Sequence, residues 1–116
     1  MGASTFGKVI EIMKQPKRSP WGSVDYAWEI APGAWECVTP SHGGIKLSDA
    51  LNRRIPARWR DLDGRGWYEE DFNWAIPFHF LGLPGPDSVP EEQWAPIVRA
   101  TLERWHPDAL SIEVTP

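Results

Sequence analysis

The sequence predicts an α+β fold, in which a small antiparallel sheet has two to three helices packed on one face. Two observations lead to this class. Segments that alternate with the period of a strand and segments with helical spacing both occur along the chain, and they do not follow the regular strand-helix-strand order that builds a parallel sheet. Because 116 residues is close to the usual size of one domain, we expect residues 1–116 to form a single domain.

The predicted strands come first. Residues 5–14 alternate loosely and are expected to form the first strand. Residues 26–39 are expected to form a hairpin around Pro32-Gly33, with Ala31 and Ala34 beside the turn. That register pairs Ile30 with Trp35, Glu29 with Glu36 and Trp28 with Cys37. It places Cys37 in the core and sets the two glutamates opposite one another in water.

Three helices are predicted in the rest of the chain. Ser48 is placed to cap a short helix over residues 48–54, which Pro56 ends. Residues 67–76 are predicted to form a second helix with acidic residues in its first turn, and Pro77 is expected to end or kink this helix. Residues 89–105 show the clearest helical spacing, preceded by a Ser-x-x-Glu capping box that begins at Ser88. Residues 110–114 then alternate as a final strand.

Charge and composition narrow the class of function. The formal net charge of −4 disfavours direct nucleic-acid binding through phosphate neutralisation. Residues 46–65 hold six basic and three acidic residues, whereas residues 66–95 hold six acidic and no basic ones. Eight tryptophans beside this segregated charge suit either a large aromatic core or a protein–protein surface. The single cysteine excludes an internal disulfide, and no signal peptide or membrane span is evident, so we expect a cytoplasmic protein without a membrane partner.

The loop Ser41-His42-Gly43-Gly44 is the first candidate site. Adjacent glycines allow close approach to the backbone, and the two residues before them handle protons. The loop could bind an anion together with the start of the following helix, but it lacks the pattern of a P-loop. The alternative is a tight structural connection.

A second candidate site is the acidic run from Glu69 to Asp71. Glu70 or Asp71 could orient His42 as a general base, which would give a small hydrolase or transferase. The structural alternative is that these acids form salt bridges with the arginines of residues 53–65. A Ser41 or Cys37 nucleophile would need a third group and an oxyanion hole. The histidines are scattered and no ligand pair has metal-site spacing, so we expect neither a metal nor another cofactor.

Two segments carry a resemblance to a known family. Residues 39–44 read Thr-Pro-Ser-His-Gly-Gly, and residues 67–71 read Trp-Tyr-Glu-Glu-Asp with Trp74 following. Together they resemble an uncharacterised domain family of phages, plasmids and other mobile elements, over a core of residues 35–81. The resemblance implies that His42, Gly43 and Gly44 meet Trp67, Glu70, Asp71 and Trp74 in one cluster. It also implies a mobile-element protein in the cytoplasm of a host cell.

The leading functional hypothesis is stoichiometric protein binding, with a host nuclease, restriction complex or CRISPR–Cas complex as the inhibited partner. The alternatives are the small hydrolase or transferase with His42, Glu70 and Asp71, and a structural component of a virion or conjugation machine. The sequence leaves the oligomeric state open. The residues expected to carry binding are Ser41, His42, Gly43, Gly44, Arg53, Arg54, Trp67, Tyr68, Glu69, Glu70, Asp71 and Trp74.

Overall fold

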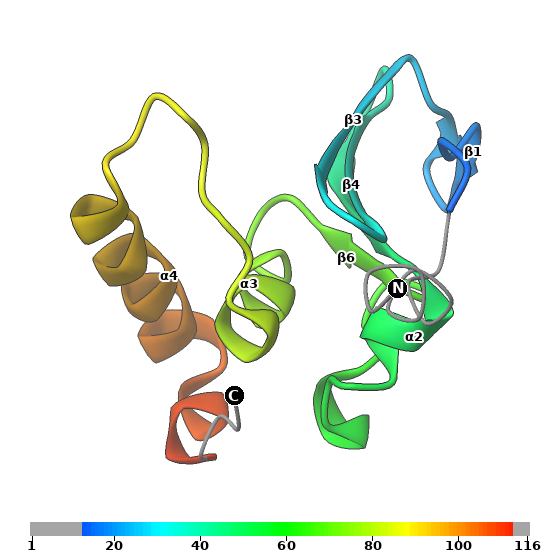
Figure 1. Ribbon diagram of the computed structural model, residues 1–116. Coiled ribbons are helices and arrows are strands. Elements are labelled where there is room, and N and C mark those ends of the chain that lie inside the picture. Colours follow the sequence, from blue (N-terminus) through cyan, green and yellow to red (C-terminus); the bar gives the residue numbers. More distant parts are fainter. Residues whose placement is uncertain (1–12, 113–116) are drawn as a thin grey trace, which may run out of the picture.

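The computed structural model describes residues 13–112, which form an α+β fold as predicted (Figure 1). The main sheet is antiparallel, with strand order β3-β4-β5-β6. Its strands are β3 (Tyr26–Ala31), β4 (Ala34–Val38), β5 (Gly43–Leu47) and β6 (Trp67–Glu69). A separate two-stranded sheet pairs β1 (Arg18–Ser19) with β2 (Gly22–Ser23). The helices are α2 (Asp49–Asn52), α3 (Ala75–Leu81) and α4 (Glu91–Trp105), with 3-10 helices η1 (Ala57–Trp59) and η2 (Pro107–Ser111).

One face of the main sheet forms the core with α3 and α4. Ile45 and Tyr68 are directly paired across β5 and β6, and both are buried on this face. They belong to one hydrophobic cluster with residues of α3 and α4, including Ile76 and Leu102, which are fully buried. The helical part of the chain therefore covers one end of this sheet face, and α3 and α4 stand to one side of the sheet (Figure 1).

The predicted register of the first hairpin is wrong by one residue. Ala31 does pair with Ala34, but an irregularity between Glu29 and Ala31 shifts the ladder, so that Glu29 pairs with Trp35 and Trp28 with Glu36. A one-residue slip moves side chains to the other face of a sheet. As a result Glu36 lies on the core face beside Trp28, and Glu29 is no longer its partner. Cys37 is nevertheless fully buried, as predicted.

The helix predicted for residues 67–76 is also wrong. Residues 67–69 form β6, which pairs with β5, and helix α3 begins only at Ala75. The strand forms because its backbone groups make hydrogen bonds with β5 at the edge of the sheet. This pairing outweighs the local preference for a helix. Pro77 does not end or kink α3. It is the third helical residue, where a backbone N–H would have no partner inside the helix.

The remaining helix predictions divide between confirmed and corrected ones. Ser48 caps α2 by accepting a hydrogen bond from the Leu51 N–H at 3.2 Å, as predicted. The long helix is confirmed as α4, but its N-cap is Pro90 and Ser88 makes no capping hydrogen bond. The strand predicted for residues 110–114 is wrong at residues 110 and 111, which belong to η2. Most of the first predicted strand, and residues 113–116, lie outside the described residues.

Candidate functional site

The Thr-Pro-Ser-His-Gly-Gly segment is the tight turn between β4 and β5. Thr39 closes it: its backbone N–H and its hydroxyl both donate to the carbonyl oxygen of His42 at 2.7 Å, and its hydroxyl accepts the His42 N–H at 3.0 Å. Ser41 and His42 are exposed. The His42 ring stacks on Trp21, with centroids 6.2 Å apart and planes 12° apart. This geometry matches the structural alternative for the loop.

Gly43 and Gly44 each leave space for a side chain, on opposite faces of the sheet. A Cβ atom on Gly43 would lie 2.6 Å from the Glu70 carboxylate oxygen Oε1, so Gly43 leaves room for Glu70 on the core face. A Cβ atom on Gly44 would lie 2.6 Å from the Trp21 ring and from the Tyr68 carbonyl oxygen, so Gly44 leaves room for Trp21 on the other face. Both glycines therefore allow another group to approach the backbone closely, as the sequence indicated.

Tyr68 anchors the Trp-Tyr-Glu-Glu-Asp segment in the core. Its buried hydroxyl donates to Asn52 Oδ1 at 2.6 Å and accepts the Asp61 N–H at 3.2 Å. Asn52 in turn donates to Asp61 Oδ1 at 2.6 Å. Trp67 lies on the opposite face, where its ring meets the edge of Trp21 at 5.6 Å. These contacts give Trp67 and Tyr68 structural roles.

Glu69 shapes the chain between β6 and α3. Its buried carboxylate accepts the backbone N–H groups of residues 71, 72 and 73 at 2.5, 3.1 and 3.1 Å. Asp71 is exposed, and the arginines of residues 53–65 pair elsewhere: Arg58 with Asp108 and Arg65 with Asp49. The expected salt bridges between these arginines and the acidic run are therefore absent among residues 13–112.

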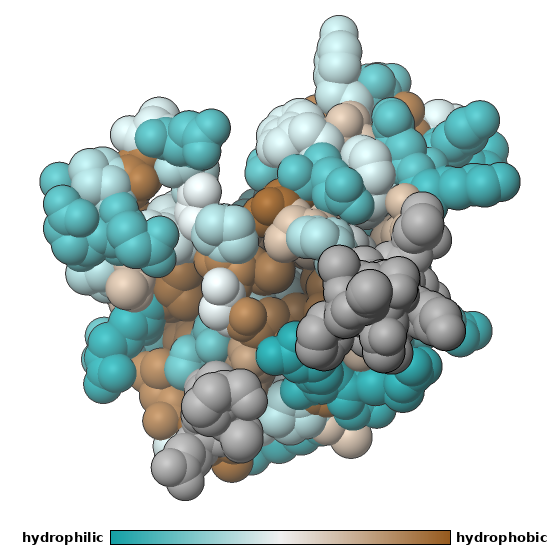
Figure 2. All heavy atoms as spheres, viewed as in Figure 1, coloured by the Kyte–Doolittle hydropathy of each residue, from teal (hydrophilic) through white to brown (hydrophobic). Residues whose placement is uncertain are grey.

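A cleft separates the exposed end of the sheet from the helices. It has a volume of about 540 Å³, and the space-filling view shows it as a notch between two lobes (Figure 2). We call it the sheet–helix cleft. The residues that line it come from β3, β4 and β5, from the segment between β6 and α3, from α3 and α4, and from the loop between these helices: Trp28, Glu29, Ile30, Glu36, Cys37, Val38, Gly43, Gly44, Ile45, Glu70, Trp74, Phe78, Pro84, Gly85, Pro86, Asp87 and Trp94.

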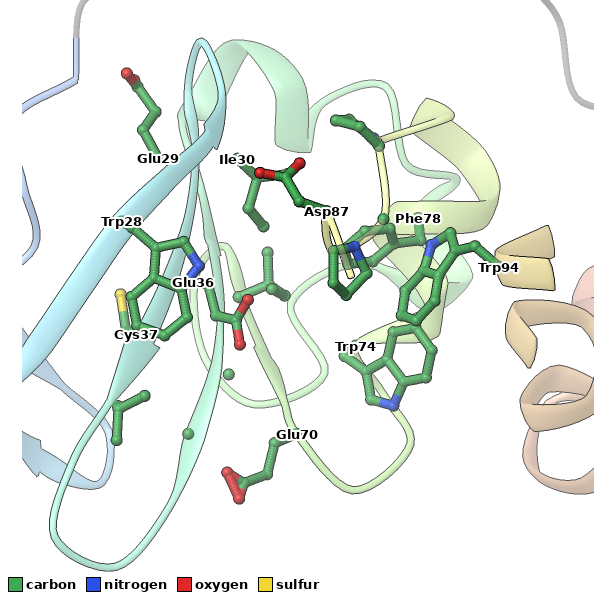
Figure 3. A pocket seen from close by; sticks show the side chains of 17 residues that line it. Trp28, Glu29, Ile30, Glu36, Cys37, Glu70, Trp74, Phe78, Asp87 and Trp94 are labelled. Atoms are coloured by element: carbon green, nitrogen blue, oxygen red, sulfur yellow. The ribbon is translucent and has the colours of Figure 1, made fainter. Parts of the chain in front are cut away.

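Aromatic rings form much of the cleft wall. Trp74, Phe78 and Trp94 pack together, with centroid distances of 5.3 to 5.5 Å. Trp28 faces them from the sheet side (Figure 3) and is 47% exposed. Tyr26, two residues before Trp28 on the same edge strand, is 70% exposed. The cleft and its rim thus offer several large aromatic surfaces to a ligand.

The cleft is also acidic. Figure 3 shows the Glu36, Glu70 and Asp87 side chains around the hollow, whereas Glu29 points away from its centre. Burial raises the pKa of Glu36. A hydrogen bond from the Trp28 side chain lowers that pKa, and the nearby Glu70 charge raises it further. No Lys, Arg or His residue of the described chain lines the cleft.

The predicted catalytic side chains of His42, Glu70 and Asp71 are not joined in the part of the chain that the structure describes. Within residues 13–112, no hydrogen bond or ion pair joins the His42 side chain to Glu70 or Asp71, and His42 contacts Trp21 instead. Burial raises the pKa of the Cys37 thiol to about 12, which keeps it protonated and a poor nucleophile. In the same part of the chain, no group of three or more His, Cys, Asp or Glu side chains is placed to hold a metal ion.

Arg53 and Arg54 lie apart from this site. Both are exposed just after α2, and neither lines the sheet–helix cleft. The structure thus divides the residues expected to carry binding. Gly43, Gly44, Glu70 and Trp74 meet at the cleft, while Trp67, Tyr68 and Glu69 support the sheet and the turn behind it.

Comparison with known proteins adds a family. A family model described as a domain of unknown function, DUF7007, matches residues 14–114. The chain belongs to this family. The DUF7007 match extends well beyond the core of residues 35–81 that the two boxes indicated, and it takes in every element of the cleft. No curated protein and no solved structure matches the chain. Across the described part of this DUF7007 domain, no helix has the length and apolar character to span a membrane.

The sequence analysis missed most residues of the cleft, among them Trp28, Glu36, Asp87 and Trp94. Trp28 and Glu36 were placed on opposite faces because the shift in register near Ile30 leaves no clear local signal. Asp87 lies in the loop before α4 and Trp94 lies on α4, and only the packing of α4 against α3 brings them to the sheet. The proline and glycine residues around Asp87 were the one available sign of a fixed loop.

Proposed function

We propose that this DUF7007 protein is a binding module that forms a stoichiometric complex with another protein through the sheet–helix cleft. The observation that carries the proposal is the concentration of partly exposed aromatic side chains at the cleft. Trp28 and Tyr26 are 47% and 70% exposed on the edge strand β3, and Trp74 and Trp94 lie across from Trp28. Tryptophan and tyrosine side chains dominate the residues that contribute most to protein–protein affinity.

The edge strand adds to this surface. β3 is paired only on its β4 side within the described chain, so its other edge is open at the rim of the cleft. An open edge can accept backbone hydrogen bonds from an added strand. A partner could then contact the cleft with side chains and the edge with its backbone.

The biological setting that we propose is a phage, plasmid or other mobile element. The two sequence boxes support it through their resemblance to a family of mobile elements. The partner proposed is a host defence complex, either CRISPR–Cas or restriction, which the protein would inhibit by occupying a functional surface. This part rests on the resemblance and not on the geometry of the cleft.

The test is co-purification of the full chain from its host, followed by light scattering of the isolated complex. The wild type should elute with one partner protein at a fixed molar ratio. A Tyr26→Ala/Trp28→Ala variant should lose the partner, because it removes the two exposed aromatic side chains of β3 without removing a buried residue. Asp71→Asn, an exposed change outside the cleft, should keep it.

Two results would contradict the proposal. If the wild type elutes without a partner, or only as a homo-oligomer, stoichiometric binding to a host protein is wrong. If Arg53→Ala/Arg54→Ala loses the partner while the aromatic variant keeps it, the binding surface is the basic segment after α2 and not the cleft.

A further inference from the structure

We infer, on the basis of the proposed binding role, that the sheet–helix cleft receives a basic side chain of the partner protein, and that an arginine guanidinium fits it best. The cleft is lined by aromatic rings and carboxylates, and no residue of the described chain neutralises it. Each of these features favours a cation, and together they favour a planar one.

The aromatic wall of the cleft favours a cation. Trp74 and Trp94 lie 5.3 Å apart with planes tilted by 34°, and Phe78 meets each of them edge-on at 5.5 and 5.3 Å. Trp28 faces this group from β3 across the hollow (Figure 3). A cation within about 6 Å of a tryptophan face is attracted by the negative charge density of the ring. A cationic group between these walls would meet more than one such face.

The carboxylates of the cleft also favour a cation. Glu36, Glu70 and Asp87 surround the hollow, and none of them forms an ion pair with a described residue. The ion pairs of the described chain lie elsewhere, such as Arg58 with Asp108 and Arg99 with Glu103. Glu36 is partly buried and feels the charge of Glu70, which makes its ionised form costly without a counter-charge. A ligand cation would supply that counter-charge.

The choice among cations follows from shape. A guanidinium is planar, is weakly hydrated, stacks on aromatic faces and presents several N–H donors that match carboxylates. A lysine ammonium is a compact charge that holds its water more strongly, so it gains less from the ring faces. A neutral sugar could stack on the tryptophans, but it would leave three carboxylates without a counter-charge.

The test is a titration of ¹⁵N-labelled full-length protein with N-acetylarginine methylamide, followed through the indole N–H signals of its tryptophans. The neutral probe of nearly the same shape is N-acetylcitrulline methylamide, and the corresponding lysine compound tests the preference for a guanidinium. The arginine probe should shift the Trp28 and Trp74 signals saturably. The citrulline probe should bind about tenfold more weakly, which is the loss expected for one charge-assisted contact.

A pair of neighbouring acids gives a matched control. Glu70→Gln should weaken arginine binding about tenfold, whereas Asp71→Asn should leave it unchanged, because Glu70 lines the cleft and Asp71 does not. Both residues are exposed, so neither change should disturb the fold. Glu36→Gln provides a second cleft variant with the same expected loss.

Several results would overturn the inference. If the citrulline probe binds as tightly as the arginine probe, the cleft does not recognise charge. If the lysine probe binds more tightly than the arginine probe, the cleft does not prefer a guanidinium. Equal losses of arginine binding in Glu70→Gln and Asp71→Asn would show a general effect of charge. A missing arginine response overturns the inference. If the wild type still co-purifies with a partner in that case, the proposed function stands and only the nature of the inserted group is wrong.

Discussion

The two adjacent glycines of β5 should respond very differently to the same substitution. In Gly44→Ala the new Cβ atom would lie 2.6 Å from the backbone carbonyl oxygen of Tyr68 and 2.6 Å from the Trp21 ring. Ordinary contact is 3.4–4 Å, so β6 or the tryptophan must move. Overpacking of this kind costs about 1–3 kcal/mol. The entropic gain from replacing glycine in a strand offsets about 0.5–1 kcal/mol of that cost.

In Gly43→Ala the closest atom is instead the end of a flexible side chain. The new Cβ atom would lie 2.6 Å from Glu70 Oε1, and the next contact is the Cys37 carbonyl oxygen at 3.1 Å. Glu70 is exposed and can rotate away. We therefore expect the free energy of unfolding to stay within about 1 kcal/mol of the wild type. Arginine binding should nevertheless weaken, because Glu70 would leave its place beside the cleft.

The assay is urea unfolding followed by tryptophan fluorescence, with thermal melting followed by circular dichroism. Gly44→Ala should lose about 1–2 kcal/mol of the free energy of unfolding. For a domain of this size, the melting temperature should then fall by roughly 4–10 °C. Equal stability of the two variants, or greater damage from Gly43→Ala, would refute the assignment of the two glycines to opposite faces.

Three further predictions concern other parts of the molecule. Tyr68→Phe should cost about 1–3 kcal/mol in urea unfolding, because it leaves the buried Asn52 side chain and the Asp61 N–H without their partner, and an unchanged midpoint would contradict this role. Glu36→Gln should raise stability at pH 7. The raised pKa of Glu36 means that the folded state binds the proton more tightly, so the carboxyl group favours folding at low pH and loses this contribution as the pH rises through its folded pKa. The gain should vanish below the unfolded pKa of about 4.3, and a gain that persists in acid would be inconsistent with this cause. In a phage-plaquing assay against a host with active CRISPR–Cas or restriction, the wild type should restore infection and Tyr26→Ala/Trp28→Ala should not. Failure of a folded His42→Ala variant alone would instead favour the enzymatic hypothesis.

The sequence was most informative where the signals are local. The cap at Ser48, the long helix α4 and the turn at Pro32-Gly33 follow from capping, periodicity and turn chemistry, and the structure confirms them. These features depend on neighbours a few residues apart, which a single sequence displays. Cys37 is buried as predicted, but it pairs with Ala27 and not with Trp28 as expected.

The errors occur where distant parts of the chain decide the outcome. Residues 67–69 form a strand because β5 is available to pair with them, and the local run of acids gives no sign of this. The irregularity beside Ile30 places Glu36 on the same face of the sheet as Trp28. No turn residue near Ile30 indicates this irregularity. The sequence therefore identified only Gly43, Gly44, Glu70 and Trp74 of the residues that line the sheet–helix cleft. The other lining residues depend on the register of β3 and on the packing of α4.

Site-specific photo-crosslinking in the host tests the proposed binding surface most directly. A photo-reactive phenylalanine analogue replaces Tyr26, two residues before Trp28 on β3, in one sample and Arg53 after α2 in another, since both positions are exposed. We predict a single crosslinked protein from position 26 and none from position 53. Crosslinking from position 53 alone, or from neither position while the complex still co-purifies, would contradict a contact surface at the sheet–helix cleft.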